Sequence, residues 1–313
     1  MLVKQPEIMA ADAAGIARAA ARLRAGEPVA LPTETVYGLA ATAQSDAAVA
    51  AIYRAKGRPD FNPLIVHVPD LAVAERLAVV DERARALAQA FWPGALTMVL
   101  PHRADSGLAA AVTAGLPTVA LRCPAHPVMR AVLAAAGVPL AAPSANRSGG
   151  VSPTTADHVA ASLAGRIALV LDGGPCAQGL ESTIVALRAE GWQVLRPGPI
   201  SADAIAEVLG EGELADAAHR IEAPGQLASH YAPGKPVRLG AEARTGDEFL
   251  IGFGAVAGDV NLSAAGDLAE AASLLYACLH AAAAAPHPRV AVAPVPDAGI
   301  GAAINDRLRR AAA

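Results

Sequence analysis

The chain has 313 residues, which is long for one domain and comfortable for two. Its formal net charge is −4, so it lacks the overall basic field that holds nucleic acid. The three cysteines are far apart and no Cys-x-x-Cys pair occurs, which argues against a zinc site and a disulfide framework. The amino-terminal residues show no apolar signal core, and the apolar run at 268–285 is mostly alanine, so we expect a packed helix there and a soluble, cytoplasmic protein.

Short apolar runs and helical repeats alternate along residues 1–211. The run at 63–68 is continuously apolar, which is typical of a strand buried on both faces. Further strands are predicted at 29–31, 95–100, 118–122, 138–142, 168–171, 182–187 and 193–195. Helices are predicted at 12–24, 45–55, 71–91, 126–136, 153–163 and 201–209. Because strands often follow one another directly, the pattern favours a mixed α/β sheet covered by helices over a strict parallel barrel.

The character of the sequence changes after Gly210. Residues 214–222 are polar and alanine-rich, and 224–233 has proline and glycine at both ends, so 212–235 is predicted to be an extended linker. Behind it, strands are predicted at 237–239, 248–252 and 290–293, and helices at 267–285 and 300–312. We therefore predict a first domain over 1–211 and a small Rossmann-like α/β domain over 236–313.

Several common site motifs are absent from the sequence. There is no Gly-x4-Gly-Lys-Ser/Thr phosphate loop, no His-x3-His or His-Glu-x2-His pair and no Gly-x-Ser-x-Gly elbow, so we predict no protein-held metal site. Gly252-Phe-Gly254 follows a predicted strand as a dinucleotide fingerprint does, but the residues behind it do not begin a convincing helix. A glycine-rich turn is the plainer interpretation.

Four basic residues are placed where they could hold anions. Lys56 and Arg58 lie two apart on a turn after a helix, which suits phosphate or bicarbonate, although a solvated pair at a helix end is the alternative. Arg122 and Arg196 each follow an apolar strand, where an unpartnered charge costs several kcal/mol. Each could clamp a carboxylate or, equally well, form an internal salt bridge.

Polar residues at strand ends are the other candidates. His67 lies inside a predicted strand, where a single histidine is more often a satisfied core residue than a ligand-binding one. Ser144, Asn146, Ser182 and Thr183 stand beside glycine or proline, and such residues most often only make turns. Their joint placement at strand ends nevertheless predicts a shared crevice.

Taken together, these segments resemble the YrdC/Sua5 family. They include Pro32-Thr-Glu-Thr-Val-Tyr-Gly-Leu39, and the others are 56–64, 92–97, 122–127, 142–146, 172–174, 181–184 and 195–199. The Lys-x-Arg…Ser-x-Asn signature of the family stands here as Lys56, Arg58, Ser144 and Asn146. Residues 224–233 and 299–309 resemble the longer Sua5 form, which carries a second domain.

The resemblance implies a YrdC-like twisted mixed sheet with a concave, positively charged pocket. It also implies L-threonylcarbamoyl-adenylate synthase activity, in which L-threonine, bicarbonate or CO2, and ATP react and pyrophosphate is released. Mg2+ is expected to arrive with ATP and to be held mostly by phosphates and water. The product of such enzymes feeds the t6A modification of tRNA, which a separate threonylcarbamoyl transferase complex completes.

The resemblance also implies a role for particular residues. The residues expected to bind the ATP phosphates and bicarbonate are Lys56, Arg58 and Arg196, and the first two are expected to be catalytic. Those completing the nucleotide site are Asn62, Thr118, Ser144, Asn146, Ser152 and, from the linker, His230 and Tyr231. Those for threonine are Thr35, His67, Arg122, Ala142 and Ser182, of which Arg122 takes the carboxylate. The linker is expected to fold over the mouth of the pocket as a lid.

Two other functions stay open. A double-stranded RNA or tRNA-binding module is the main alternative, because this fold family has a concave basic face that attracts phosphate backbones. The net negative charge argues against it, so any tRNA binding is expected to be weak. A regulatory nucleotide sensor would bind ATP without depending on threonine.

Overall fold

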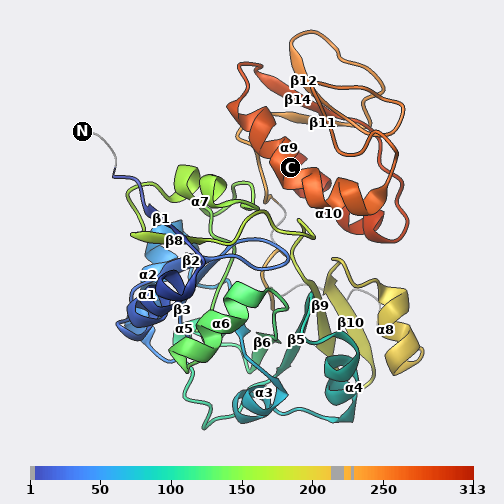
Figure 1. The fold of residues 1–313 in the computed structure, drawn as a ribbon. Coiled ribbons are helices and arrows are strands. Elements are labelled where there is room, and N and C mark those ends of the chain that lie inside the picture. The colour runs from blue at the N-terminus through green and yellow to red at the C-terminus, as the bar shows by residue number, and fades with distance from the viewer. Residues whose placement is uncertain (1–3, 213–221, 227–228) are drawn as a thin grey trace.

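The computed structural model describes residues 4–212, 222–226 and 229–313 (Figure 1). Within them the chain forms a large mixed sheet followed by a smaller parallel one. Most of the linker stretch predicted at 214–222 lies outside the described residues. The second sheet begins at Val237, and the boundaries 1–211, 212–235 and 236–313 stay a prediction. No helix among the described residues is long and apolar enough to cross a membrane.

The first sheet has ten strands in the order β1-β8-β2-β3-β7-β4-β6-β5-β9-β10. They are β1 (Glu7–Ala10), β2 (Val29–Leu31), β3 (Gly38–Thr42), β4 (Ile65–His67), β5 (Leu96–Pro101), β6 (Thr118–Arg122), β7 (Leu140–Ala141), β8 (Leu169–Asp172), β9 (Thr183–Leu187) and β10 (Trp192–Arg196). Strand β4 pairs in parallel with β6 and antiparallel with β7, so the mixed sheet is confirmed. Its central position explains why 63–68 is apolar except for His67.

Helices cover this sheet (Figure 1). They are α1 (Ala13–Arg24), α2 (Asp46–Lys56), α3 (Leu71–Leu77), α4 (Glu82–Phe91), α5 (Ala110–Thr113), α6 (Pro127–Ala136), α7 (Ala156–Leu163) and α8 (Ala202–Leu209). The side chain of Ser45 caps α2 by accepting from the Ala48 amide. Gly57 ends α2 with a φ of 61°, which suits glycine, and the turn places Lys56 and Arg58 at the end of the helix.

The single helix predicted over 71–91 is wrong. The chain leaves the helical conformation at Ala78, which pairs instead with His102 beyond the end of β5. Asp81 then caps α4 by accepting from the Ala84 amide. Two strands of the first sheet were also missed, as was the short helix α5. Strand β1 is short, and β3, of small residues, is recognisable as a strand only through its pairing with β2 and β7.

The second sheet is entirely parallel, in the order β11-β14-β12-β13. Its strands are β11 (Val237–Leu239), β12 (Glu248–Gly252), β13 (Val260–Asn261) and β14 (Arg289–Val292), and its helices are α9 (Leu268–Ala284) and α10 (Ile300–Ala312). Both helices lie between this sheet and the first domain (Figure 1). The predicted small Rossmann-like α/β domain is therefore confirmed.

The two domains are in close contact through α9. A Cβ atom added to Gly179 would lie 2.5 Å from the Cα atom of Ser273, so the loop before β9 packs directly on this helix. His158 of α7 stacks on His280 of α9 with ring centroids 3.8 Å apart. The second domain is thereby held against the loop that leads to Glu181, a residue of the site described next.

Candidate functional site

A pocket opens where the ends of several strands of the large sheet meet the linker. The predicted site residues that line it are Thr35, Arg58, His67, Arg122, Ala142, Ser144, Ser182, Arg196, His230 and Tyr231. They come from stretches separated by up to about 200 residues of sequence. The fold brings them together at the strand ends, where the sequence analysis predicted a shared crevice.

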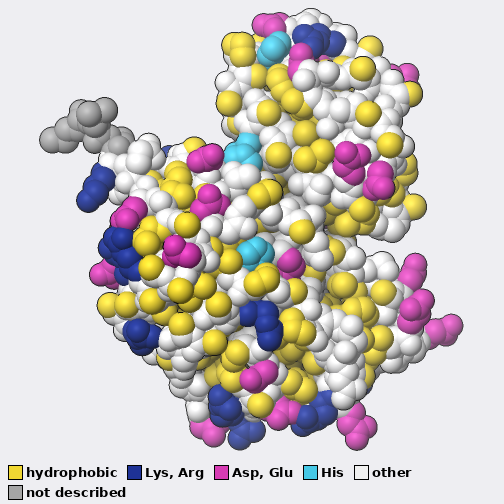
Figure 2. All heavy atoms as spheres, in the orientation of Figure 1, with side chains coloured by type: hydrophobic (Ala, Val, Ile, Leu, Met, Phe, Trp, Pro, Cys, Tyr) yellow, Lys and Arg dark blue, Asp and Glu magenta, His cyan; other side chains and the backbone are white. Residues whose placement is uncertain are grey.

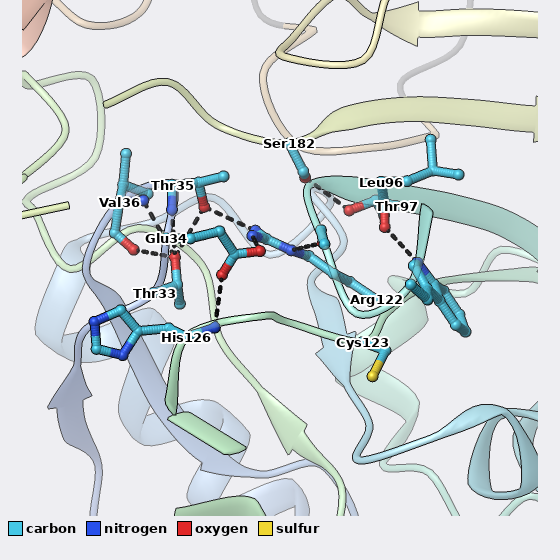
Figure 3. A network of polar contacts seen from close by, with 12 residues as sticks. Thr33, Glu34, Thr35, Val36, Leu96, Thr97, Arg122, Cys123, His126 and Ser182 are labelled. Carbon is cyan, nitrogen blue, oxygen red and sulfur yellow. Dashed lines mark hydrogen bonds and ion pairs between the residues drawn. The ribbon is translucent and has the colours of Figure 1, made fainter. Parts of the chain in front are cut away.

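One wall of the pocket is built around Arg122, the last residue of β6 (Figure 3). Its Nη2 atom lies 2.5 Å from Oε1 of Glu34, its Nη1 donates to Oγ1 of Thr35 at 2.8 Å, and its Nε donates to the Gly94 carbonyl at 3.1 Å. A guanidinium carries five N–H bonds, so about two remain for a ligand. Arg122 thus combines the internal salt bridge with the capacity to bind a carboxylate.

Glu34 is the ion-pair partner of Arg122, and the sequence analysis did not single it out. Burial pushes its pKa upward, but the charge and hydrogen bond of Arg122 outweigh burial and hold the pKa below its ordinary value. The carboxylate is therefore ionised at neutral pH and neutralises Arg122. The signal for it was present, because Glu34 lies between Thr33 and Thr35 in the quoted segment 32–39 and a buried arginine needs a partner.

Thr35 is held in place by a tight polar turn. Oγ1 of Thr33 accepts from the amides of Thr35 and Val36 and donates to the Val36 carbonyl. The two threonine hydroxyls lie 2.8 Å apart. Across the pocket, the hydroxyls of Ser182 and Thr97 lie 2.7 Å apart (Figure 3). These short networks fix the hydroxyl groups that face Arg122.

Another part of the pocket holds Arg58 and Arg196. Arg58 donates to the carbonyls of Asn62 and Pro63, and Arg196 donates twice to the Ser182 carbonyl at 3.1 and 2.8 Å. Burial lowers the pKa of both, that of Arg58 to about 10, so both remain protonated at neutral pH. Among the described residues neither makes an ion pair within 4 Å, which leaves two buried positive charges available to an anion.

Lys56 points at a turn and is not among the pocket-lining residues. It is 3% exposed, and its Nζ donates to the carbonyls of Ser144 and Asn146. Burial, with a smaller contribution from Arg58, lowers the pKa of Lys56 well below its ordinary value. The side chain of Lys56 therefore holds the turn that places Ser144 in the pocket. These contacts bring the four signature residues into one cluster.

Asn62, Asn146 and Ser152 lie behind the lining of the pocket. Neither side-chain polar atom of Asn62 has a partner among the described residues, although the residue is 1% exposed. The amide nitrogen of Asn146 donates to two carbonyls of its own loop. Ser152 donates to Oε1 of Glu181 at 2.5 Å. Their assignment to the nucleotide stays a prediction, with the orphaned amide of Asn62 pointing most directly to a ligand.

Thr118 is the one predicted residue that lies apart from the others. It begins β6 opposite Pro101, four residues before Arg122 at the other end of that strand. At a strand rise of about 3.3 Å per residue the two are separated by roughly 13 Å. The fold does not bring Thr118 to the lining of this pocket.

Glu181 was also missed by the sequence analysis, although it stands in the quoted segment 181–184. It lines the pocket, and it joins the two domains. Its Oε1 accepts from Ser152, and its Oε2 accepts from Tyr276 at 2.7 Å and from Arg307 at 3.0 Å. Burial would raise its pKa, but the charges of Arg307 and then Arg196 lower the pKa to about 2.

The linker reaches the pocket at both of its described parts. Pro224, Gly225, His230 and Tyr231 belong to the lining. Burial lowers the pKa of His230 to about 3, so its ring is neutral at pH 7, and its Nδ1 has no partner among the described residues. The linker thus forms one wall of the site.

Comparisons with known proteins agree with this architecture. A family model for Sua5, YciO and YrdC proteins, described as Telomere recombination, matches residues 21–198. A second, described as Threonylcarbamoyl-AMP synthase, C-terminal domain, matches residues 200–313. A solved structure of Pyrococcus abyssi Sua5 complexed with L-threonine superposes with a TM-score of 0.91 at 35% identity, covering 98% of this chain and 97% of that one.

Curated relatives give the same result. The Threonylcarbamoyl-AMP synthase of Bacillus subtilis (strain 168) is 49% identical over 229 residues, covering 72% of this chain and 66% of the relative. That of Pyrococcus abyssi (strain GE5 / Orsay) is 44% identical over 225 residues, covering 70% and 66%. The matched part of the chain thus spans 66% of the length of either relative. With both family models matched in order, the chain belongs to the Sua5 family and has both of its domains.

Proposed function

We propose that the protein is an L-threonylcarbamoyl-adenylate synthase, which joins L-threonine, bicarbonate or CO2, and ATP and releases pyrophosphate. The observation that carries this proposal is one pocket with two kinds of arginine. Arg122 is charge-balanced by Glu34 and keeps N–H groups for a carboxylate, whereas Arg58 and Arg196 are buried without an ion pair among the described residues. A small amino acid and a polyanion can therefore bind side by side.

The first step is the capture of CO2 by the threonine amine, which forms a carbamate and releases a proton. A carbamate decomposes in water, so the pocket must exclude solvent until the carbamate reacts. His230 and Tyr231 of the linker are buried and line the pocket, which supports the linker as its cover. If alanine at both positions left the fraction of intermediate lost to hydrolysis unchanged, the covering role would be wrong.

In the second step a carbamate oxygen attacks the α-phosphorus of ATP, the bond to the bridging oxygen breaks, and pyrophosphate leaves with the electron pair. Negative charge increases on the phosphoryl oxygens and on the leaving group, so positioned cations accelerate the reaction. Arg58 and Arg196 are suited to this, because their other N–H groups are held by backbone carbonyls. No covalent intermediate with the protein is required.

Mg2+ would enter with ATP. Glu181, which lines the pocket, and Glu34, which holds Arg122, are already paired with arginines. No cluster of three or more metal-binding side chains occurs among the described residues. The residues present fit an ion held by phosphates and water, whose contribution is to neutralise the triphosphate.

Unpartnered polar atoms mark where ligand groups would bind. Among the described residues, the amide of Asn62 and the Nδ1 atoms of His67 and His230 are buried without a hydrogen-bond partner. Burial of a polar atom without a partner costs about 1–3 kcal/mol. Burial, followed by the charge of Arg122, lowers the pKa of His67 to about 3, so a neutral imidazole faces the bound amino acid.

The product would serve tRNA modification through a separate transferase complex, and we place the reaction in the cytoplasm with its ATP and tRNA. Direct tRNA binding is not required. On the face shown in Figure 2, basic side chains are interspersed with acidic ones and form no continuous strip. If tRNA bound at micromolar or tighter concentration at physiological salt, the tRNA-binding alternative would be favoured.

The test of the proposal is threonine-dependent chemistry. Purified protein given threonine, bicarbonate, Mg-ATP and pyrophosphatase should release phosphate and form threonylcarbamoyl-AMP, identified by its mass. Arg58→Ala should lower turnover about 100-fold or more, as expected for the loss of one charged contact in the transition state. Lys56→Ala should also lower turnover, because Lys56 holds the turn that carries Ser144 into the pocket. Arg54→Ala is the matched control, because Arg54 is exposed on the same helix. ATP binding without threonine dependence would identify a nucleotide sensor instead.

A further inference from the structure

Arg307 of α10 is a fully buried arginine that belongs to the second domain but binds the first. It is 0% exposed, its Nε lies 3.0 Å from Oε2 of Glu181, and its Nη2 donates to the Pro197 carbonyl at 2.9 Å. Among its bonds to the described residues, only the one to Asp306 stays within its own helix. A guanidinium removed from water is costly unless its hydrogen bonds are satisfied, so the first domain provides what this residue needs.

Both partners of Arg307 in the first domain flank Arg196. Pro197 follows Arg196 directly, and Glu181 precedes Ser182, whose carbonyl accepts two of the hydrogen bonds from Arg196. The guanidinium of Arg307 therefore ties together the two chain segments between which Arg196 is held. A displacement of either segment would turn Arg196 within the pocket.

The same guanidinium also contacts the linker. Its Cζ lies 5.3 Å from the ring centroid of Tyr231, within the range of a cation–π contact. Tyr231 is 1% exposed and has a φ of 63°, which is unfavourable for a residue with a side chain and persists only when its surroundings hold it. The ring of Tyr276 of α9 lies against the ring of Tyr231, with the two centroids 5.6 Å apart.

Charge gives Arg307 a further effect on the pocket. Glu181 lines the pocket, and an uncompensated carboxylate there would repel a triphosphate and attract Arg196. Arg307 does not line the pocket, so it neutralises this carboxylate from behind the pocket lining. Arg58 and Arg196 then remain available for phosphate.

We propose that Arg307 is a positioning residue of the nucleotide site, through which the second domain keeps Arg196 available to the triphosphate of ATP. The residue acts through Glu181, Pro197 and Tyr231 and does not line the pocket itself. This inference rests on the proposed function in that it takes ATP as the anion.

The experiment measures the Kd of a non-hydrolysable ATP analogue with Mg2+, together with the KM for each substrate. Arg307→Met should weaken the analogue about tenfold or more, the size expected for one charged contact. The KM for threonine should change less than threefold, because Arg122 and Glu34 are left intact. Arg309→Met is the control, because Arg309 is exposed on the same helix, and it should match the wild type.

A charge rescue distinguishes positioning from mere support of the fold. The double variant Glu181→Gln with Arg307→Met removes both charges while the amide can still accept from Tyr276. It should recover most of the lost analogue affinity and should also fold if Arg307→Met alone does not. Equal effects of Arg307→Met and Arg309→Met, or a double variant no better than the single one, would overturn the proposal.

Failure of the proposed function gives a different result. Wild-type protein that binds the analogue but never consumes threonine would refute the synthase activity, and the Arg307 comparison could still be made by Kd. Wild-type protein with no nucleotide affinity would refute both.

Discussion

Removal of Arg122 separates the structural from the functional part of its role. Arg122→Met would leave Glu34 as a buried carboxylate without its cation, since the two side chains are 4% and 10% exposed. Breaking one partner from a buried ion pair costs about 3–5 kcal/mol of the free energy of unfolding. Adding Glu34→Gln removes the stranded charge as well, and replacement of both partners of such a pair is often close to neutral.

Threonine binding should respond differently from stability. One or two hydrogen bonds from the guanidinium to the threonine carboxylate amount to about 3 kcal/mol, which corresponds to a roughly 100-fold higher KM for threonine. Because neither methionine nor glutamine supplies that charge, the double variant should regain stability and keep the high KM. The KM for ATP should change little in both variants.

Urea unfolding and steady-state pyrophosphate release measure the two effects on the same preparations. Arg130→Met is the control, because Arg130 is exposed on α6. A double variant that recovered both stability and threonine affinity would show that Arg122 acts only through the fold. An unchanged KM for threonine in Arg122→Met would refute the carboxylate role directly.

Three further outcomes follow from the site. The pKa of Glu181 is about 2 in the folded protein and 4.5 ordinarily, so its ionised form stabilises the protein by about 3 kcal/mol above pH 4.5. This stabilisation is lost as the pH falls towards 2, so the free energy of unfolding of Glu181→Gln should depend less on pH over that range than that of the wild type. Gly198→Ala should lower the free energy of unfolding in urea by about 1–3 kcal/mol and should also raise the KM for ATP. The added Cβ would lie 2.5 Å from the Thr183 amide and 2.7 Å from the Glu181 backbone carbonyl, next to Arg196. Serine should be used with a lower kcat/KM than threonine, by a factor equivalent to about 1–3 kcal/mol, because the threonine methyl group would fill space beside Val36 and Ala142. Equal use of both amino acids would contradict that placement.

The sequence predicted most of the fold because its strongest signals are local. Continuous apolar runs identified the buried strands, and capping residues such as Ser45 and Ser201 marked where helices begin. The errors occurred where tertiary pairing decides the conformation. Ala78 has good helix propensity, yet it leaves the helix to pair with His102.

The site was predicted less evenly, and the difference has a physical cause. Arg122 and Arg196 could be identified because a charge after an apolar strand is unusual in itself. Their environment could not, because Glu34 lies 88 residues from Arg122 and Glu181 lies 126 residues from Arg307. Their place in the segments 32–39 and 181–184 was a local signal, but it does not say which arginine each carboxylate binds.

The two carboxylates nevertheless share a placement. Each directly precedes a hydroxyl residue that lines the pocket, Thr35 after Glu34 and Ser182 after Glu181. In both cases the acid holds an arginine, and the backbone thus fixed presents the hydroxyl to the ligand. One of those arginines comes from the first domain and the other from the second. At each acid-hydroxyl pair, an ion pair therefore fixes the position of a hydroxyl group that lines the pocket. The second domain contributes to one of the two pairs through Arg307.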